Sequence, residues 1–301
     1  MTGMVATGGL VDSDGGRVGA RSRLGATVAV FVENRLAMAG IVVVGLFILF
    51  CFVGPLLYHT NQVNTSFITS NESPRGGHLL GTDAEGYDIL GRLMAGGQSA
   101  LEVGLGVAVL ATGFGMLWGA VAGYVGGWLD SVLMRVVDAA LAIPTLFLLI
   151  FLAAIITPSI GLLIVVITAV SWMPAARLVR GEALTLRQRE YVAASRGMGA
   201  RPSYVVLRHI VPNTVGTIMV NGTLNVANAI LLVAYLSFLG LGVPPPDASW
   251  GSMLSDGINY IGAGYWWEIY PAGACIVLIV VAFNAIGDGL RGAVEVRLQR
   301  R

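Results

Sequence analysis

Lysine is missing from the sequence, since all 18 of its basic residues are arginine. A P-loop needs a lysine that reaches the nucleotide phosphates, so this chain does not contain one. Charged residues are also scarce, at 12% of 301 residues against 55% hydrophobic residues, whereas soluble domains carry about 25% charged residues. This composition excludes an ordinary soluble domain, and it excludes disorder, which needs low hydrophobicity and high net charge. The formal net charge of +1 provides no basic field for binding nucleic acid.

Cysteine and histidine are too few and too dispersed to indicate a disulfide or a metal site. The two cysteines, Cys51 and Cys275, fall inside apolar stretches, where we expect each to pack as a small apolar side chain. The three histidines, His59, His78 and His209, do not follow a metal-ligand spacing. His59 and His78 share one predicted loop, which allows a shared metal, but two solvated loop histidines are the simpler interpretation. We therefore predict no metal site.

Long apolar stretches without charge dominate the sequence and predict membrane-spanning helices. A helix rises 1.5 Å per residue, so about 20 residues cross the hydrocarbon layer. The longest stretch, residues 139–176, is almost long enough for two crossings, and Thr157-Pro158-Ser159 predicts a turn near its middle. The predicted fold is therefore an all-α membrane protein. Its six transmembrane helices are predicted at residues 36–57, 101–124, 138–156, 160–178, 213–238 and 267–289.

The arginines lie mainly in alternate loops, which predicts the orientation of the chain. With the N-terminus inside, 16 arginines fall in inner segments and only Arg75 and Arg92 fall outside. Because cytoplasmic loops retain positive charge, both termini are predicted to be cytoplasmic. Residues 24–35 mix apolar and polar side chains and predict an interfacial helix on the inner membrane surface. Residues 1–23 and 299–301 are predicted to be cytoplasmic tails, the first of them flexible.

A row of glycines marks the second predicted span and its end. Gly115, Gly119, Gly123 and Gly127 are spaced four residues apart, so on one helix they would share a face. Small residues on a membrane helix let a neighbouring backbone approach closely. The row therefore predicts close helix packing, and the pattern leaves open whether the neighbour belongs to this chain or to another subunit.

No charged residue falls in the middle of a predicted span. A charge at the bilayer centre costs roughly 2.5–3.5 kcal/mol, so ion and proton sites are expected to show such residues. Backbone carbonyls can also coordinate sodium, so the pattern argues against ion-coupled transport without excluding it. The nearest acidic residues all lie close to predicted span ends, at Glu102, Asp138, Glu268 and Asp288.

The predicted inner loop between the fourth and fifth spans, residues 180–212, is long, rich in arginine and patterned. Residues 190–196 favour a helix, Gly197 and Gly199 interrupt it, and a second short helix follows until Pro212 ends it. Two short helices at a glycine elbow would project from the membrane, and residues 180–212 are termed the knob. A basic loop lying on anionic headgroups is an alternative. One side of the first helix would offer a partner's groove three small residues, Ala193, Ala194 and Ser195.

The knob resembles the coupling loop, or EAA loop, of the membrane permease subunits of ATP-binding-cassette (ABC) importers, in the peptide and nickel branch. The similarity runs over residues 190–200 and 208–213. It extends in the same order to further segments, and together they cover about residues 36–298, the expected permease domain. The further segments are residues 78–88, 237–245, 250–254 and 282–291.

The resemblance implies the type I ABC importer permease fold in the bacterial cell membrane. It implies that the chain forms half of a pathway for short peptides, beside a second homologous permease subunit. Two cytoplasmic ABC ATPases would bind ATP and Mg²⁺, so this chain would have no ATPase site and no cofactor of its own. An extracellular or lipid-anchored binding protein would deliver the substrate. A nickel or other small-chelate importer is an alternative, as are a stand-alone secondary transporter and a non-transporting scaffold.

The resemblance also assigns roles to residues, although it leaves the substrate-binding residues unknown. Coupling to the ATPase is expected at Glu190, Tyr191, Ala193, Ala194, Ser195, Arg196, Gly197, Gly199, Arg208, His209 and Pro212. Docking of the binding protein is expected, from their side of the membrane, at Asp83, Asp88, Asp247 and Trp250. The chain departs from the family at Ala193, where the motif has glutamate, and at Tyr87 and Gln98, where relatives usually carry arginine.

Overall fold

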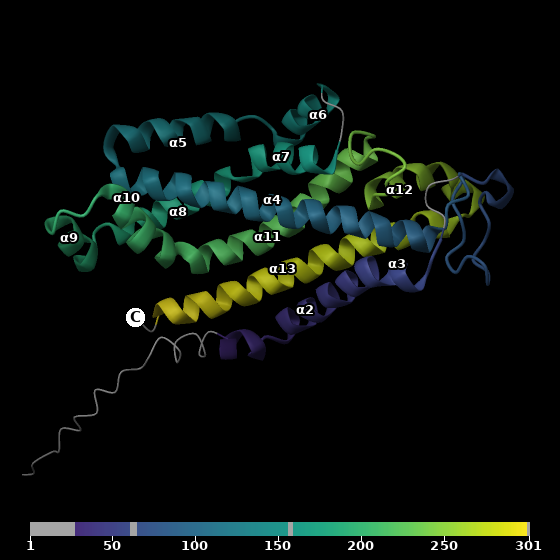
Figure 1. Ribbon diagram of the computed structural model, residues 1–301, viewed down its shortest axis with the longest axis horizontal. Helices are drawn as coiled ribbons and strands as arrows, with labels where there is room; N and C mark the ends of the chain where they lie inside the picture. The colour runs from purple at the N-terminus through teal and green to yellow at the C-terminus, as the bar shows by residue number, and fades with distance from the viewer. Residues whose placement is uncertain (1–27, 61–64, 156–158, 300–301) are drawn as a thin grey trace, which may run out of the picture.

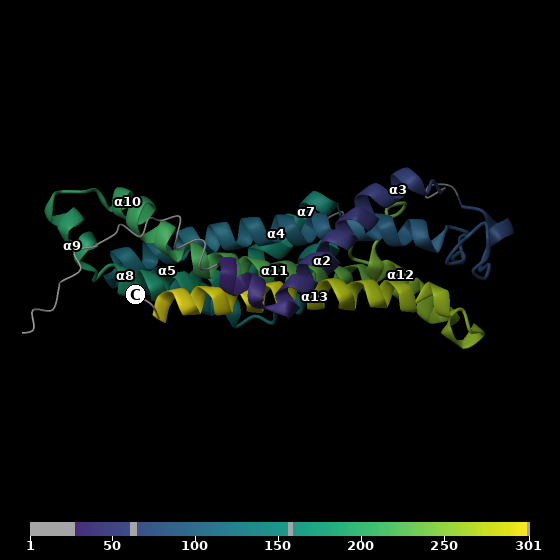
Figure 2. The ribbon, with the colours of Figure 1, turned by 90° about the horizontal axis from the view of Figure 1, so that it is seen from below.

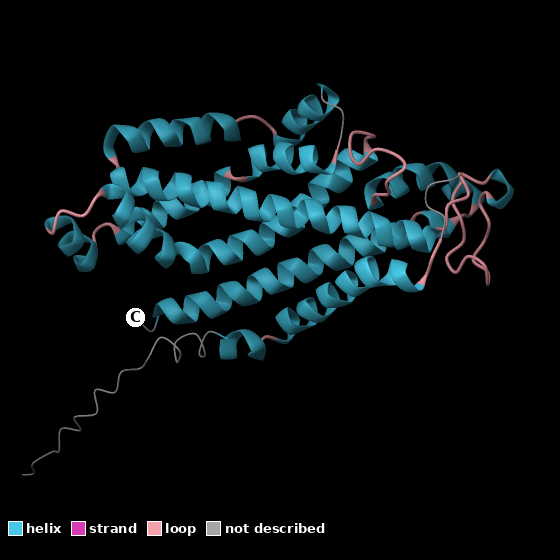
Figure 3. Ribbon diagram, in the orientation of Figure 1, coloured by secondary structure: helices cyan, strands magenta, loops and turns pink. Residues whose placement is uncertain are grey.

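The computed structural model describes residues 28–60, 65–155 and 159–299. All regular secondary structure in these ranges is helical (Figures 1 and 3). The tail predicted at residues 1–23, most of the predicted turn at Thr157-Pro158-Ser159 and residues 300–301 lie outside the described residues. Residues 28–33 are helical, inside the interval predicted to be an interfacial helix. That helix stops at Asn34, whose side chain caps the next one by accepting from the backbone N–H groups of Leu36 and Ala37.

Four helical stretches are long and apolar enough to cross a membrane, and they run roughly along one common axis (Figures 1 and 2). Within them, α4 packs against α11, α11 packs against α13, and α13 packs against α2. The first stretch consists of α2 (Arg35–Ile48), the π-helix η1 (Leu49–Val53) and α3 (Gly54–Leu57). The other three contain α4 (Ile89–Val125), α11 (Val211–Phe238) and α13 (Tyr270–Gln299).

Two pairs of shorter helices are sharply bent, and counting each pair as one span brings the number of candidate spans to six. Helices α5 (Gly127–Leu141) and α6 (Thr145–Ile155) meet at 81°, and α7 (Ile160–Ser171) and α8 (Met173–Leu186) meet at 45°. The spans predicted at residues 138–156 and 160–178 therefore correspond to bent helix pairs at residues 127–155 and 160–186, and the sequence did not indicate the bends. Pro144 stands just before α6 and Pro174 in the first turn of α8, and proline cannot continue a helix from the preceding turn.

The remaining span limits are corrected mainly outward. Helix α4 begins at Ile89 rather than residue 101, because the side chain of Asp88 caps it there. Arg92 and Gln98 therefore lie inside the helix rather than in a loop before it. Helix α13 continues to Gln299, ten residues past its predicted end. Pro212 does not end a helix, since α10 (Pro202–Val205) and the π-helix η3 (Val206–Ile210) lead directly into α11. There Pro212 occupies the first turn, where a missing N–H is tolerated.

The two ends of the bundle differ in composition and structure. The knob and the last residues of α13 lie at one end (Figure 1). The opposite end carries residues 65–88 and 240–268, which are termed the cap. The cap contains the short helices η2 (Phe67–Thr69), α12 (Trp250–Gly257), η4 (Ile258–Ala263) and η5 (Trp266–Glu268).

The glycine row brings the backbones of α4 and α8 into direct contact. A Cβ atom built on Gly119 would lie 2.2 Å from the carbonyl oxygen of Ala176. The equivalent atoms on Gly115 and Gly123 would lie 2.5 Å and 2.6 Å from the carbonyl oxygens of Trp172 and Arg180. No side chain fits at these positions without separating the helices, so the neighbour in this structure is a helix of the same chain.

Gly127 does not belong to this row, and its prediction as a packing residue is wrong. Helix α4 ends at Val125, and Gly126 and Gly127 have φ values of +70° and +59°, which turn the chain into α5. A Cβ on Gly127 would meet no atom within 4 Å. Glycine is needed at this position for the turn, because other residues disfavour a left-handed backbone conformation.

We predict that Gly119→Ala destabilises the protein, because the new methyl group must push α8 away from α4. Overpacking of this kind typically costs about 1–3 kcal/mol. The melting temperature of the purified protein in detergent should therefore fall.

Gly113→Ala is the matched control, since it lies on the same helix and its Cβ would meet no atom within 4 Å. It should keep or raise the melting temperature, because alanine is the better helix former. Equal melting temperatures for the two variants would show that the α4–α8 contact is not tight.

Candidate functional sites at the two ends of the bundle

The knob projects beyond the other helices at its end of the molecule (Figures 1 and 2). Residues 180–186 of the knob extend α8, and the projecting part begins with α9 (Glu190–Gly197). Gly199 then adopts φ +82° before α10 begins. Only glycine takes this left-handed conformation readily, so Gly199 sets the elbow between the two short helices, whereas Gly197 is still helical.

One face of α9 is fixed to the bundle. Val192 and Ser195 are buried, with 0% and 5% exposure, and residues three apart share a helix face. Val192 packs in an apolar cluster with Val179 of α8, Val205 of α10 and Ile210 of η3. Any force on α9 therefore reaches these helices directly.

The opposite face of α9 is exposed, and most of its side chains are small. Ala193, Ala194, Arg196 and Gly197 are all exposed, as is Met198, with 82% exposure at the tip. The interpretation that Ser195 shares a docking side with the two alanines is wrong, because it turns toward the bundle. The glycine and alanines leave room for a partner's side chains to approach the helix backbone.

The second half of the knob is held by aromatic contacts around His209. Its ring lies 5.8 Å from that of Tyr191 and 5.9 Å from that of Tyr204, so it bridges the two short helices. Arg208 and Pro212 are exposed beside it. Glu190 is exposed in the first turn of α9, where a negative charge is favoured by the helix dipole.

Polar contacts tie the base of the knob to three other helices. Arg180 of α8 forms a bidentate ion pair with Asp130 of α5, with distances of 2.6 and 2.7 Å. Arg187 donates from Nη1 to the carbonyl oxygen of Gly123 on α4 at 3.3 Å. Thr217 of α11 donates to the carboxylate of Glu182. The knob is thus part of one mechanical unit with α4, α5, α8 and α11.

At the other end, two of the four residues predicted for docking are buried and hold the cap together. Asp88 has 2% exposure and accepts hydrogen bonds from Tyr58 and from the backbone N–H of Gly91, and it pairs with His78 at 2.9 Å. Trp250 has 2% exposure and donates to the carbonyl oxygen of Leu93 at 2.9 Å. The docking prediction is wrong for both residues, because a partner cannot reach these side chains.

Asp83 lies half-buried in the cap with an unusual acidity. Burial raises its pKa to about 6, against the lowering effects of the Tyr87 N–H, which donates to it at 2.7 Å, and of Arg92. Arg92 Nε lies 3.9 Å from Asp83 Oδ2, too far for a hydrogen bond. Of the four predicted docking residues, Asp247 alone is fully exposed.

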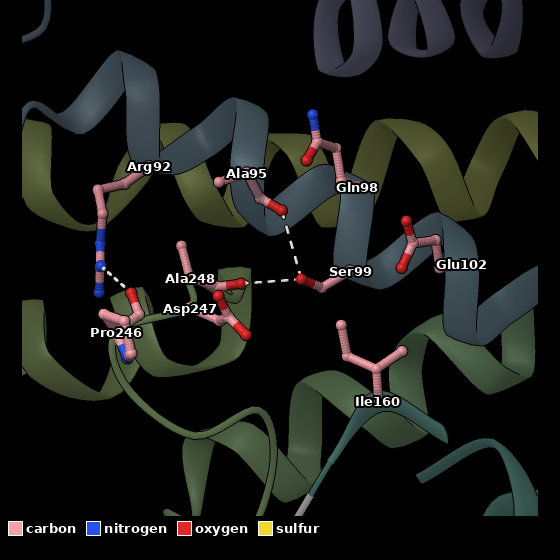
Figure 4. Close-up of a pocket in the computed structure, with 9 residues that line it drawn as sticks. All are labelled: Arg92, Ala95, Gln98, Ser99, Glu102, Ile160, Pro246, Asp247 and Ala248. Atoms are coloured by element: carbon pink, nitrogen blue, oxygen red, sulfur yellow. Dashed lines mark hydrogen bonds between the residues drawn. The ribbon is translucent and has the colours of Figure 1, made fainter. Parts of the chain in front are cut away.

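A cavity of about 250 Å³ opens between α4, the first residue of α7 and the cap segment 246–248 (Figure 4). Its polar lining comes from Arg92, Gln98, Ser99, Glu102 and Asp247. The sequence interpretation missed this site, because it placed Glu102 at a span end. In the structure Glu102 lies 13 residues, or about 20 Å, inside α4, and no local signal in the sequence joins it to Asp247.

No group of three or more potential metal-ligating side chains occurs in the part of the chain that the structure describes. Cys51 and Cys275 are both free, with Cys51 buried.

We predict that the stability of the cap depends on the ionisation of Asp83. Because the pKa of Asp83 is higher in the folded protein than in the unfolded chain, the protonated side chain stabilises the fold. This stabilisation is complete below the unfolded-state pKa near 4 and is lost as the pH rises through about 6. The loss is at most about 3 kcal/mol. Thermal unfolding in detergent should therefore show a melting temperature that falls from pH 4.5 to pH 7.

Asp83→Asn should flatten this fall, because the amide does not ionise. Glu190→Gln, at the opposite end, should retain the wild-type slope. An unchanged slope in Asp83→Asn would assign the pH dependence to other acids of the cap, such as Asp256, whose pKa is also raised by burial.

Comparison with known proteins matches the chain to transport proteins. Residues 115–300 match the family model of the binding-protein-dependent transport system inner membrane component. Residues 22–74 match the N-terminal transmembrane domain of oligopeptide transport permease C. The resemblance to ABC importer permeases, inferred from the knob and the further segments, is therefore confirmed, as is a multi-pass protein of the bacterial plasma membrane.

Individual relatives align over most of the chain. The oligopeptide transport system permease protein OppC of Bacillus subtilis is 38% identical over 90% of this chain and 88% of its own length. The dipeptide permease DppC of the same species is 38% identical over 89% and 84%. OppC of Haemophilus influenzae is 36% identical over 88% and 86%. The chain therefore belongs to the family of inner membrane components of binding-protein-dependent transport systems.

Proposed function

We propose that this chain is a permease subunit of an ATP-driven importer of short peptides. The family supports a role in transport, and the relatives are named for oligopeptide and dipeptide transport. The observation that carries the mechanism is the knob, with one face of α9 packed on the bundle and the other face free. A handle of this kind suits a partner that pushes on the membrane helices from outside them.

The chain works in this proposal with subunits that supply energy and substrate. Two cytoplasmic ABC ATPases bind ATP and Mg²⁺, and each receives a knob in a surface groove. A second homologous permease forms the other half of the pathway, and an extracellular or lipid-anchored binding protein delivers the peptide. The absence of lysine, and hence of a P-loop, supports an energy source outside this chain.

The membrane topology proposed here has six spans with both termini in the cytoplasm. The two bent pairs count as the third and fourth spans, and the knob and the end of α13 lie on the cytoplasmic side. Two observations support this orientation. The knob and the end of α13 share one end of the bundle (Figure 1), and the predicted inner segments hold 16 of the 18 arginines.

Coupling then follows from the contacts at the base of the knob. ATP binding draws the two ATPases together, and each knob moves with the ATPase that holds it. The Asp130–Arg180 ion pair and the glycine contact carry this movement into α5 and α4. The nucleotide site and the peptide pathway are thereby linked through one two-state element.

The test is uptake of peptide by vesicles that contain the complete importer. A charge at Ala194 should prevent the ATPase from binding to α9, because an unpaired charge buried at an interface costs over about 1.4 kcal/mol. Ala194→Glu should therefore lower ATP-driven uptake about tenfold or more. The amount of inserted protein should not change. The variant should also lose the stimulation of ATP hydrolysis by the loaded binding protein.

Ser131→Glu is the matched control, because it adds the same charge to an exposed position of α5 at the same end, one helical turn from Arg135. It should keep wild-type uptake. Normal uptake by Ala194→Glu would contradict the role of the knob. Uptake that persists without the ATPases, driven by an ion gradient, would contradict the importer itself.

A further inference from the structure

The cavity beneath the cap has more hydrogen-bond acceptors than donors facing it. Glu102 and Asp247 line it from different elements (Figure 4), and neither carboxylate has an ion pair or hydrogen bond among the described residues. Gln98 donates its amide N–H to the carbonyl oxygen of Cys51, which leaves its own oxygen free. Ser99 directs its hydroxyl hydrogen to the carbonyl oxygens of Ala95 and Ala248, which leaves its lone pairs free.

The one cation of the cavity wall is already engaged. Arg92 has 9% exposure and donates from Nη1 to the carbonyl oxygen of Pro246 at 3.0 Å, and its guanidinium lies 4.5 Å from the ring centre of Tyr87. Its Nε also lies 3.9 Å from Asp83 Oδ2, and among the described residues it forms no ion pair with Glu102 or Asp247. One donor remains, because Arg92 Nε is buried and has no hydrogen-bond partner within the described ranges.

The face of α4 that carries Glu102 combines a charged side chain with apolar ones. Glu102 is exposed in the isolated chain, about 20 Å from the start of α4. Leu105 and Val109, on the same face, are 48% and 70% exposed. A carboxylate is unfavourable against hydrocarbon, and exposed apolar side chains beside it are unfavourable in water, so this mixed face is suited to lie against a second subunit.

We propose that the cavity is a substrate subsite that binds a primary ammonium group of a peptide between Glu102 and Asp247. An ammonium group offers three donors and one positive charge, which matches two free carboxylates and the acceptors of Gln98 and Ser99. The cavity, at about 250 Å³, is smaller than typical ligand pockets of about 300–1,000 Å³. It therefore holds one end of a peptide, and the rest extends into the pathway.

Arg92 gives this subsite a direction. It lies ten residues before Glu102, or about 15 Å along α4, which is the length of about four residues of extended peptide. The Arg92 guanidinium brings a positive charge to that end of the cavity wall, so it would attract a carbonyl or carboxylate oxygen further along the same peptide. The subsite rests on the proposed function, since it supplies the substrate contacts that peptide import requires.

The first experiment compares uptake by the complete importer in vesicles. The double variant Glu102→Gln and Asp247→Asn keeps the shape of the cavity and removes its charge, so peptide uptake should fall about tenfold or more, because a hydrogen bond to a charged group contributes about 1.5–3 kcal/mol. Glu85→Gln makes the same chemical change at an exposed cap position outside the cavity and should retain wild-type uptake. The peptide affinity of the separate binding protein is measured as well, and it cannot change with these substitutions.

The second experiment detects the ammonium group directly. Glu102→Cys is placed in a Cys51→Ala and Cys275→Ala background, and the assembled importer is treated with a positively or a negatively charged methanethiosulfonate reagent. The cationic reagent should react several-fold faster, and Asp247→Asn should reduce that ratio. A peptide with a free amino group should slow the reaction at position 102, and it should not slow the reaction at Glu85→Cys.

Two further peptides identify the source of the ammonium group. An N-acetylated alanine peptide has no ammonium group and should not slow the reaction at position 102. An N-acetylated peptide with a lysine side chain should slow it if the subsite accepts any primary ammonium group, and should not slow it if the subsite accepts the N-terminus alone. Equal rates for the two reagents, together with normal uptake by the double variant, would overturn the subsite. That result would leave the proposed function intact, because the latter is tested separately by the dependence of wild-type peptide uptake on ATP and on the ATPases.

Discussion

Contact between the backbones of α4 and α8 is the constraint on which the rest of the structure depends. Lipid is as apolar as leucine, so membrane helices gain little from burying large apolar side chains against one another, and close packing must supply the attraction. Gly115, Gly119 and Gly123 allow this contact. The contact also brings Arg180 within reach of Asp130 and Arg187 within reach of the Gly123 carbonyl. The orientation of the knob relative to the bundle follows from it.

The sequence was sufficient to predict the features that depend on local composition. An all-helical membrane fold, the first span and the glycine elbow at residue 199 follow from charge-free runs and from the backbone freedom of glycine, and the structure agrees with them. The breaks at Pro144 and Trp172 were missed because they lie inside a continuous apolar run, where composition does not change. Proline spacing was the only local signal, and Pro212 shows how ambiguous that signal is.

Features that depend on tertiary contacts could not be predicted from the sequence. Gly96 and Gly97 lie in α4 against the ring of Trp250, and no local pattern indicates this contact between distant segments. Asp88 and Trp250 were expected in a docking surface from their side of the membrane, yet contacts with Tyr58 and Leu93, 30 and 157 residues away in the sequence, help to bury them. The cavity combines residues of α4 with Asp247, and no local pattern joins them.

Helix α4 links the knob to the cavity, and its continuity determines how movement passes between them. It runs uninterrupted over 37 residues, with the glycine row near one end and Arg92 and Glu102 near the other, so it transmits movement as a rigid rod. Helices α7 and α8 meet at 45°, and Ile160, the first residue of α7, lines the cavity. Because α8 is held against α4 while α7 lies beyond a bend, a displacement at the knob changes the angle at Trp172 more readily than it changes α4. The wall of the cavity that contains Ile160 therefore moves relative to the wall that α4 forms.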